Sequence, residues 1–329
     1  MLQQTQVATV IDYYHRFLIS YPDIRSLAAA EEQDILRLWS GLGYYRRARQ
    51  LHAAAKQIIE GSSGLTCFPS TLSEIEKLPG IGRYTAGAIA SFAFNQPAPI
   101  VEANTQRLFS RLLRLEVDPR SRDGQRQLWT FAQLLVNQKS ATPSRINQAV
   151  MELGSQICTP RNPDCPHCPL NQLCPTFADG LQLTIPKVAP KKVITELTHV
   201  ALLVRHRGLL LMLKNTADQW WTGLWDLPRV DVTHRATFRK KTVTAGSLLP
   251  VNLDWLATQF NEQYGMDCIV DQHHRTFKHP VTRYRITLHT FTATMGSRPK
   301  RHPNLAWHRL GAALELPLTA PAKKILSSL

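Results

Sequence analysis

The sequence feature that most constrains the fold is a glycine turn between two helical stretches, Leu78-Pro79-Gly80-Ile81-Gly82. Two glycines two positions apart permit a tight turn with backbone conformations that other residues resist. Small residues at helical spacing follow the turn, so the pattern predicts helix, hairpin, helix. Such a hairpin directs backbone N–H groups and a helix N-terminus at one point, which suits a DNA phosphate. An ordinary connection between two helices fits these five residues equally well.

A carboxylate follows the hairpin at the start of the next predicted helix. Residues 97–100 interrupt the helical pattern, and Glu102 and Asn104 then lie near the first turn of a helix that carries Arg107. An acid at this position can simply stabilise the helix dipole. A hairpin followed by a carboxylate at this separation also resembles the helix-hairpin-helix DNA glycosylases, in which a catalytic acid follows the phosphate-binding hairpin.

Four cysteines with the spacing C-x6-C-x2-C-x5-C form a second constellation: Cys158, Cys165, Cys168 and Cys174. Four thiolates so close together can hold a [4Fe–4S] cluster or a tetrahedral zinc ion, and spacing alone does not exclude zinc. A clustered set favours a metal centre in a reducing cytoplasm over a disulfide framework. The pattern resembles the cluster loop of the endonuclease III-like glycosylases, which implies a [4Fe–4S] cluster with a structural, positioning role.

Periodicity divides the chain into two parts. With 329 residues, 43% of them hydrophobic, the chain is long enough for two cores. Helical spacing dominates up to the cysteines, prolines and lysines mark a connector, and period-two alternation follows. We therefore expect a mainly α helix-hairpin-helix domain with its cluster loop over residues 1–180, a connector over 181–195, and an α/β domain over 196–329.

The net charge of +15 and the pI near 9.8 indicate a polyanionic partner, although a basic soluble surface gives the same balance. Residues 1–188 carry 19 Lys and Arg against 15 Asp and Glu (+4), and residues 189–329 carry 20 against 9 (+11). We expect both parts to contact nucleic acid. No apolar run reaches 18 residues and no leader pattern is present, so we expect neither a membrane span nor an export signal.

The second part resembles a Nudix-type domain. The element Gly-Leu-Trp-Asp-Leu-Pro at residues 223–228 follows a predicted strand hairpin at residues 199–213. The metal and pyrophosphate motif of Nudix hydrolases, Gly-x5-Glu-x7-Arg-Glu-x-x-Glu-Glu, is missing, and residues 254–265 offer only Glu262. We therefore expect a Nudix-like recognition domain rather than a hydrolase.

Taken together, the motifs resemble the MutY-type adenine DNA glycosylases. Met-Leu-Gln-Gln-Thr-Gln-Val at residues 1–7, Gly-Leu-Gly-Tyr-Tyr at residues 41–45, the hairpin, the four cysteines and the Nudix-like part occur in that family's order. The resemblance implies base-excision repair by monofunctional hydrolysis of the N-glycosidic bond of adenine mispaired with 8-oxoguanine or guanine in duplex DNA. It also implies a bacterial, cytoplasmic monomer that acts at the nucleoid.

The resemblance assigns DNA contacts to individual residues. Gly80 and Gly82 would hold a phosphate, Gln4 and Tyr44 would wedge into the duplex at the mispair, and Gln148 would hydrogen-bond the edge of the flipped adenine. Aromatic residues beside Arg46 and Arg47 suit base stacking, but the tyrosines could instead cap a small core.

Two further contacts follow from the resemblance. Phe277 and His279 would contact 8-oxoguanine where the family has a Phe-Ser-His loop, with Lys278 in place of the serine; an aromatic pair at a strand end is the alternative. Tyr84 would lie beside the departing nucleotide.

The chemistry needs an acid to protonate adenine N7 and a group that stabilises an oxocarbenium-like sugar. Glu102 occupies the family's aspartate position and would stabilise the sugar cation, with Tyr84 and Asn104 as catalytic neighbours. Its extra methylene moves the carboxylate by about a bond length, which matters because small misplacements can cost roughly a hundredfold in rate.

The general acid is expected outside the printed chain. In the family a glutamate lies two positions before the methionine that is Met1 here, and an amphipathic helix already starts, uncapped, at the first residue. We expect the start to be placed too late, so that the longer protein excises adenine and the printed one does not.

Three other functions remain open. A catalytically inactive mismatch-binding protein fits the same charge and hairpin. An endonuclease III-type glycosylase/lyase requires a hairpin lysine where Tyr84 stands. A Nudix-type nucleotide hydrolase is disfavoured by the missing acids.

Overall fold

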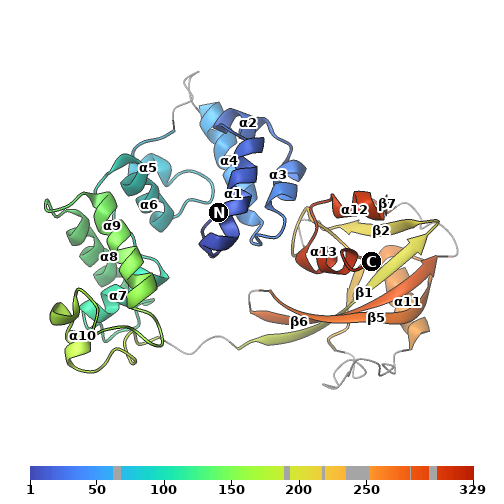
Figure 1. Cartoon of the computed structure of the whole chain (residues 1–329). Coiled ribbons are helices and arrows are strands. Elements are labelled where there is room, and N and C mark those ends of the chain that lie inside the picture. Colours follow the sequence, from blue (N-terminus) through green and yellow to red (C-terminus); the bar gives the residue numbers. More distant parts are fainter. Residues whose placement is uncertain (62–67, 189–192, 217–218, 235–251, 282, 296–301) are drawn as a thin grey trace. The chain divides into compact units, whose positions relative to one another are not determined.

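The computed structural model describes residues 1–61, 68–188, 193–216, 219–234, 252–281, 283–295 and 302–329. These residues form two compact units, Met1–His52 with Lys192–Leu329, and Ala53–Lys191 (Figure 1). The expected connector at 181–195 contains one of the two breaks between the units. The other break lies within a helix, so the first 52 residues group with the C-terminal part of the chain.

Three short helices and the start of a fourth make up the N-terminal piece of the first unit: α1 Val7–Ser20, α2 Ile24–Ala29, α3 Glu32–Trp39 and α4 Arg46–Gly61. Phe17 of α1 packs edge-on against Trp39 of α3, with 6.1 Å between ring centroids. The expectation of a helix from the first residue was wrong, because α1 begins at Val7. Gln4 has a left-handed φ of 58°, which is incompatible with a continuous helix through residues 1–6.

The second unit is helical in its described residues. Its elements are α5 Leu72–Ile75, α6 Arg83–Phe94, α7 Ala103–Leu112, α8 Arg122–Val136, α9 Pro143–Glu152, a π turn Leu153–Ile157, a 3₁₀ turn Asn171–Leu173 and α10 Pro175–Ala178. The small residues Ala86 and Ala90 bring α6 close to Ile75 of α5. The predicted helix, hairpin, helix is therefore confirmed, and α7, α8 and the cysteine segment share a core around Leu108 and Leu128.

The C-terminal part of the first unit is a mixed seven-stranded sheet with helices on both faces (Figure 1). The strands run in the order β3-β2-β1-β6-β5; β4 also pairs with β1, and β7 with β2. Only the β1–β6 pair is parallel among the described strands. Their bounds are β1 Thr195–His206, β2 Leu209–Lys214, β3 Trp225–Asp226, β4 Arg229–Asp231, β5 Cys268–Val281, β6 Tyr284–Met295 and β7 Leu305–Arg309.

The period-two pattern of β1 explains the two layers of helices. Val200 and Leu202 point to the core beneath α11 (Leu253–Tyr264), whereas Ala201 and Leu203 point to the core beneath α12 (Leu310–Leu314) and α13 (Ala320–Leu326). Alternate side chains of a strand face opposite sides of a sheet, so each face is buried separately. The expected α/β architecture is confirmed. Within the described residues, no helix is long and apolar enough to cross a membrane.

Candidate functional site

The hairpin leaves backbone donors available at the start of α6. Gly80 has a left-handed φ of 77°, so its conformation requires glycine. Gly82 has an ordinary φ of −93°, and a Cβ added there would meet open space, which corrects the expectation that both glycines adopt unusual conformations. Gly82 is the N-cap of α6 and supplies no side-chain hydrogen bond. The first N–H groups of α6 can therefore bind an anion.

Glu102 caps the N-terminus of α7, as the sequence predicted. Its Oε1 accepts hydrogen bonds from the backbone N–H groups of Asn104 at 2.8 Å and Thr105 at 2.9 Å. The Thr105 hydroxyl in turn accepts the N–H of Glu102 at 2.8 Å, which completes a capping box. Within the described residues Oε2 accepts no hydrogen bond. One carboxylate oxygen is thus fixed by the helix and the other is free to face a cation.

Tyr84, in the first turn of α6, lies within electrostatic reach of Glu102. Burial, and to a smaller extent the negative charge of Glu102, raise the pKa of the Tyr84 hydroxyl. Gly87 permits this approach, because a Cβ there would lie 2.2 Å from the carbonyl oxygen of Pro99. The segment that leads to Glu102 therefore lies directly against α6.

Gln148 is exposed on α9, and its amide reaches Glu152 Oε1 at 3.4 Å. No hydrogen bond joins it to Tyr84 or Glu102 in the part of the chain that the structure describes. Its neighbour Asn147 is 2% exposed and donates to Ser91 Oγ at 2.9 Å and to the carbonyl of Ala98 at 2.8 Å. Asn147 thus fixes α9 to α6 and to the segment before Glu102.

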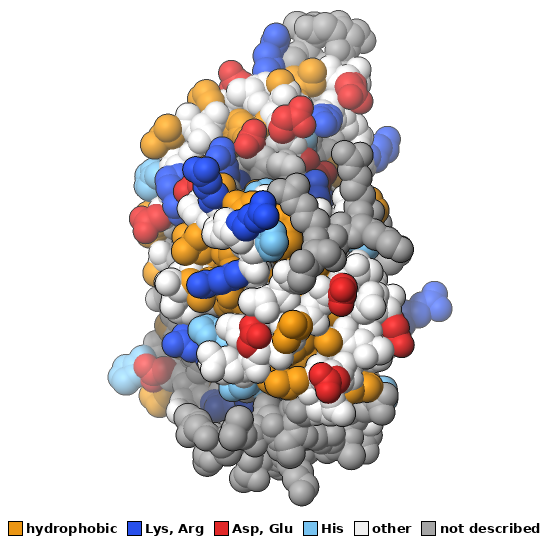
Figure 2. Space-filling view, turned by 90° about the vertical axis from the view of Figure 1, so that its right-hand side faces the viewer, with side chains coloured by type: hydrophobic (Ala, Val, Ile, Leu, Met, Phe, Trp, Pro, Cys, Tyr) orange, Lys and Arg blue, Asp and Glu red, His pale blue; other side chains and the backbone are white. Residues whose placement is uncertain are grey.

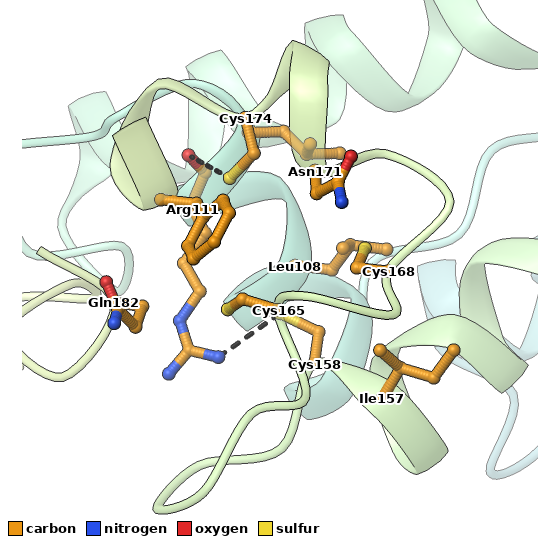
Figure 3. A pocket seen from close by; sticks show the side chains of 11 residues that line it. Leu108, Arg111, Ile157, Cys158, Cys165, Cys168, Asn171, Cys174 and Gln182 are labelled. Atoms are coloured by element: carbon orange, nitrogen blue, oxygen red, sulfur yellow. Dashed lines mark hydrogen bonds between the residues drawn. The ribbon is translucent and has the colours of Figure 1, made fainter. Parts of the chain in front are cut away.

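Two buried arginines connect α7 to the cysteine segment. Arg107 Nε donates to the carbonyl of Cys158 at 2.7 Å, and its Nη2 donates to Asn104 Oδ1 at 3.1 Å. Arg111 is 3% exposed and donates through Nη1 to Cys158 Sγ at 3.2 Å and through Nε to the carbonyl of Ile185 at 3.0 Å. The helix that carries Glu102 at its start is therefore held in place by the segment that contains the cysteines (Figure 3).

The four cysteines surround one cavity of about 30 Å³ together with Arg111 and apolar side chains (Figure 3). A single zinc ion with Zn–S bonds of about 2.3 Å would require its four sulfurs to lie only about 3.8 Å apart. Across the described chain, no three His, Cys, Asp or Glu side chains are close enough together to hold one ion. A donor set of four thiols around a shared cavity fits a larger group such as an iron–sulfur cluster. Burial raises the pKa of the Cys165 and Cys168 thiols, so binding of iron would release protons.

In the other unit, the structure brings together the two residues expected to wedge into DNA. Arg47 donates to the carbonyl of Met1 at 2.8 Å and to that of Gln3, and also to the carbonyls of Leu42 and Gly43 at 3.3 Å each. It therefore anchors the loop that carries Gln4 and the loop that carries Tyr44.

Both expected wedge residues adopt a rare backbone conformation. Gln4 and Tyr44 have left-handed φ angles of 58° and 48°, and the Tyr44 ring is 55% exposed beneath the Arg47 guanidinium. Non-glycine residues in this region store strain that only the surrounding structure can maintain, and such residues cluster at functional sites. Tyr45 is buried and caps the core, as one reading of the sequence expected, but Tyr44 is not.

Phe277 and His279 lie inside strand β5 rather than in a loop, opposite Leu288 and Ile286 of β6. The two aromatic side chains share one face of the strand, and Lys278 lies on the other. Burial, with the nearby positive charges of Arg229 and His199, lowers the pKa of His279 to about 4. The His279 ring is therefore neutral at physiological pH, and neither of its nitrogens has a hydrogen-bond partner within the described residues.

Basic and apolar side chains share the protein surface. On the face drawn in Figure 2, Lys, Arg and His side chains lie beside hydrophobic ones near mid-height. Such a mixture can contact both phosphates and bases of nucleic acid, in agreement with the net charge of +15.

Sequence reasoning missed four residues that organise these sites: Arg47, Arg107, Arg111 and Asn147. Arg107 and Arg111 are four apart on the helix face that carries Leu108 and Leu112, a spacing that could have marked them as buried. Arg47 was noted only as a basic neighbour of the tyrosines. The sequence carries no local signal for Asn147.

Comparison with known proteins gives three family matches. Residues 1–133 match the HhH-GPD superfamily of base-excision DNA repair proteins. Residues 158–174 match the iron–sulfur binding domain of endonuclease III, which confirms the predicted cluster ligands as a segment. Residues 199–328 match the NUDIX domain.

Similar proteins are adenine DNA glycosylases. The chain is 47% identical to that of Mus musculus over 178 residues, which are 54% of this chain and 34% of the mouse protein. It is 36% identical to that of Buchnera aphidicola (strain Sg) over 231 residues, 70% of this chain and 65% of the relative. The chain thus spans less than two thirds of these relatives.

A solved structure of a thermostable thymine-DNA glycosylase is also similar, with 27% identity, a TM-score of 0.48, and coverage of 54% of this chain and 80% of that one. By its three family matches and its relatives, the chain belongs to the HhH-GPD superfamily and is a homologue of the adenine DNA glycosylases, with an iron–sulfur binding segment and a C-terminal NUDIX domain.

Proposed function

We propose that the protein hydrolyses the N-glycosidic bond of adenine mispaired with 8-oxoguanine or guanine in duplex DNA. The observation that carries this proposal is the Glu102 carboxylate, with one oxygen fixed at the start of α7 and the other free, in reach of Tyr84 and one segment beyond the hairpin. The adenine DNA glycosylase relatives support the same activity.

Glu102 stabilises positive charge that develops on the deoxyribose as the bond to adenine breaks. Its position is set before substrate binds, because Asn104 and Thr105 hold Oε1; a preorganised charge does not have to reorient during the reaction. Glu102 is given only this role. The resemblance to the family assigns proton donation to a glutamate before Met1.

The cysteine segment positions rather than reacts, because glycosidic hydrolysis transfers no electrons. An iron–sulfur cluster held by the four thiols would cross-link the segment to itself. Arg107 and Arg111 would transmit that rigidity to α7, and thereby to Glu102. The N–H groups at Gly80–Arg83 hold a DNA phosphate, and Gln148 bonds the extruded adenine.

Opposite-base recognition is assigned to the first unit. Gln4 and Tyr44 enter the duplex at the mispair, and Phe277 and His279 contact the oxidised guanine. A neutral imidazole with a pKa of about 4 can donate one hydrogen bond and accept another, which suits the mixed edge of 8-oxoguanine.

The competing functions differ in their products. A mismatch-binding protein without activity would bind the same duplexes and release no base. A glycosylase/lyase would cut the strand through a Schiff base, but Tyr84 stands at the position where that reaction needs an amine.

The experiment measures affinity and base release with duplexes that carry adenine opposite 8-oxoguanine, guanine or thymine. Both the printed chain and a chain with any in-frame residues before Met1 are used. We expect both chains to bind the first two duplexes at least tenfold more tightly than the third, and the longer chain to release free adenine without strand cleavage. Equal affinity for all three duplexes, or release of an oxidised pyrimidine instead, would refute the proposal. Selective binding with no release by either chain would support the inactive alternative.

A further inference from the structure

A shallow groove of about 660 Å³ lies between the start of α6 and the side of α8. Three arginines line it, Arg83, Arg122 and Arg126, together with Trp129 and several uncharged polar side chains. We call it the α8 groove. It lies wholly in the helical unit, and none of the assigned DNA-contact residues, other than through the chain neighbour Gly82, takes part in it.

The arginines stand where a helix least favours them. Arg83 is the first residue of α6 and Arg122 the first residue of α8, and the N-terminus of a helix carries a partial positive charge. Arg122 and Arg126 are also four residues apart on one helix, where like charges repel. Without an anion, each of these placements costs stability, and a bound anion reverses the sign of all of them.

Internal acids compensate for little of this charge. Arg126 forms an exposed ion pair with Asp123, and no ion pair or hydrogen bond involves Arg83 or Arg122 within the described residues. Both are exposed. The groove therefore has a net positive charge and free guanidinium donors, which can bind phosphate oxygens in pairs.

Trp129 holds one of the arginines in position. The Arg83 guanidinium lies 3.8 Å from the centre of the Trp129 ring, and the indole N–H donates to Gln125 Oε1 at 3.1 Å. Stacking of a cation on a tryptophan face is favourable. It fixes the plane of the guanidinium and leaves its N–H edge for a ligand.

We propose that the α8 groove binds the phosphodiester backbone of duplex DNA that flanks the phosphate held by the hairpin. Arg83 directly follows Gly82, so the wall of the groove begins where the hairpin ends. A strand held at the hairpin needs to extend by only a few phosphates to reach Arg122 and Arg126. The inference rests on the proposed function in taking DNA, rather than an acidic protein segment, as the polyanion.

The test is the salt dependence of duplex binding by the full chain. The logarithm of the association constant falls with the logarithm of salt concentration, with a slope of about −0.9 per phosphate neutralised. The double variant Arg122→Gln, Arg126→Gln should therefore flatten the slope by about 1 to 2. It should also weaken binding about tenfold or more at moderate salt. Arg37→Gln is the matched control, because Arg37 is exposed and paired with Asp34 on α3 in the other unit; its slope should not change.

Two further measurements exclude trivial causes. The double variant removes repulsion from α8, so its melting temperature should be unchanged or higher than that of wild type, and weaker binding then does not reflect unfolding. A duplex shortened on one flank of the mispair should flatten the wild-type slope to the same extent and leave the slope of the variant unchanged.

An unaltered slope in the double variant, with mispair preference retained, would overturn the groove proposal and leave the proposed function standing. Wild-type protein that binds all duplexes equally would refute the proposed function, whereas a flattened slope in the variant would still support the groove. Loss of binding to an acidic peptide, with DNA binding unaffected, would show the wrong polyanion and also overturn the proposal.

Discussion

Replacing Arg47 by lysine should weaken mispair binding far more than a change that preserves charge normally does. The Arg47 guanidinium spans two loops, with hydrogen bonds to the carbonyls of Met1 at 2.8 Å and of Leu42 and Gly43 at 3.3 Å, and to Thr5 Oγ1 at 3.0 Å. A lysine ammonium keeps the charge but is a compact group on a flexible stem, without the planar fork that reaches both loops. The loops would lose their common anchor.

The size of the effect follows from the two residues that the anchor holds. Gln4 and Tyr44 keep left-handed φ angles of 58° and 48°, which cost roughly 1–3 kcal/mol each and persist only where neighbours enforce them. Without Arg47 both residues relax, and DNA has to reorder them at about 1–2 kcal/mol each. The total of about 2–4 kcal/mol corresponds to a rise in Kd of about 30- to 900-fold.

The assay is fluorescence anisotropy with a labelled duplex that carries adenine opposite 8-oxoguanine, at fixed salt. Arg46→Lys is the matched control, because Arg46 is exposed, adjacent and free of hydrogen bonds among the described residues. Thermal melting checks that both variants fold. An Arg47→Lys protein that melts normally and binds within about threefold of wild type would refute the argument that the loops are preorganised by this side chain.

Three other predictions concern stability. Arg111→Leu should destabilise the protein by about 3 kcal/mol or more and lower its iron content, because three backbone and sulfur acceptors lose a buried donor; Arg114→Leu, which breaks an exposed pair, should cost about 1 kcal/mol at most. Gly87→Ala should cost about 1–3 kcal/mol in urea unfolding, because its Cβ meets a backbone oxygen, whereas Gly82→Ala has open space and should cost no more than about 1 kcal/mol. Finally, the melting temperature should fall as pH drops from about 6.5 towards 4. The unfolded chain binds protons in that window, while three folded-state histidines have pKa values lowered to about 4 mainly by burial: His199, His279 and His289. A constant melting temperature across that range would contradict this.

Periodicity and motif spacing were sufficient for the architecture. The hairpin, the helix that starts after Glu102, the β1–β2 hairpin and the helix α11 all lie where the sequence predicts them. These elements are local: a glycine turn, a capping residue or an alternating strand specifies itself within about a dozen residues.

Contacts between distant segments could not be read in the same way. Arg111 and Cys158, or Arg47 and Gln3, are paired only because the fold brings separate segments together. The same holds for the start of α1. A helical pattern extends back to the first residue, but the tertiary bonds of Arg47 hold the first loop out of the helix, and tertiary context overrides local propensity.

The placement of Phe277 and His279 shows a different limit. A short aromatic and basic run is compatible with a loop or with a strand, and only pairing with β6 decides between them. The family resemblance suggested a loop, whereas the alternating register places both aromatic residues on one face of β5.

The central claim is that the Glu102 carboxylate is the charged group that stabilises the sugar. Single-turnover excision of adenine opposite 8-oxoguanine tests it most directly, with Glu102→Gln and Glu102→Asp compared in the chain that includes any in-frame residues before Met1. Glu102→Gln removes the charge but keeps the size, and its excision rate should fall by at least about a hundredfold with little change in Kd for the duplex. Glu102→Asp keeps the charge and can still cap α7, so its rate should stay within about tenfold of wild type. A Glu102→Gln protein that excises adenine at the wild-type rate would contradict the account.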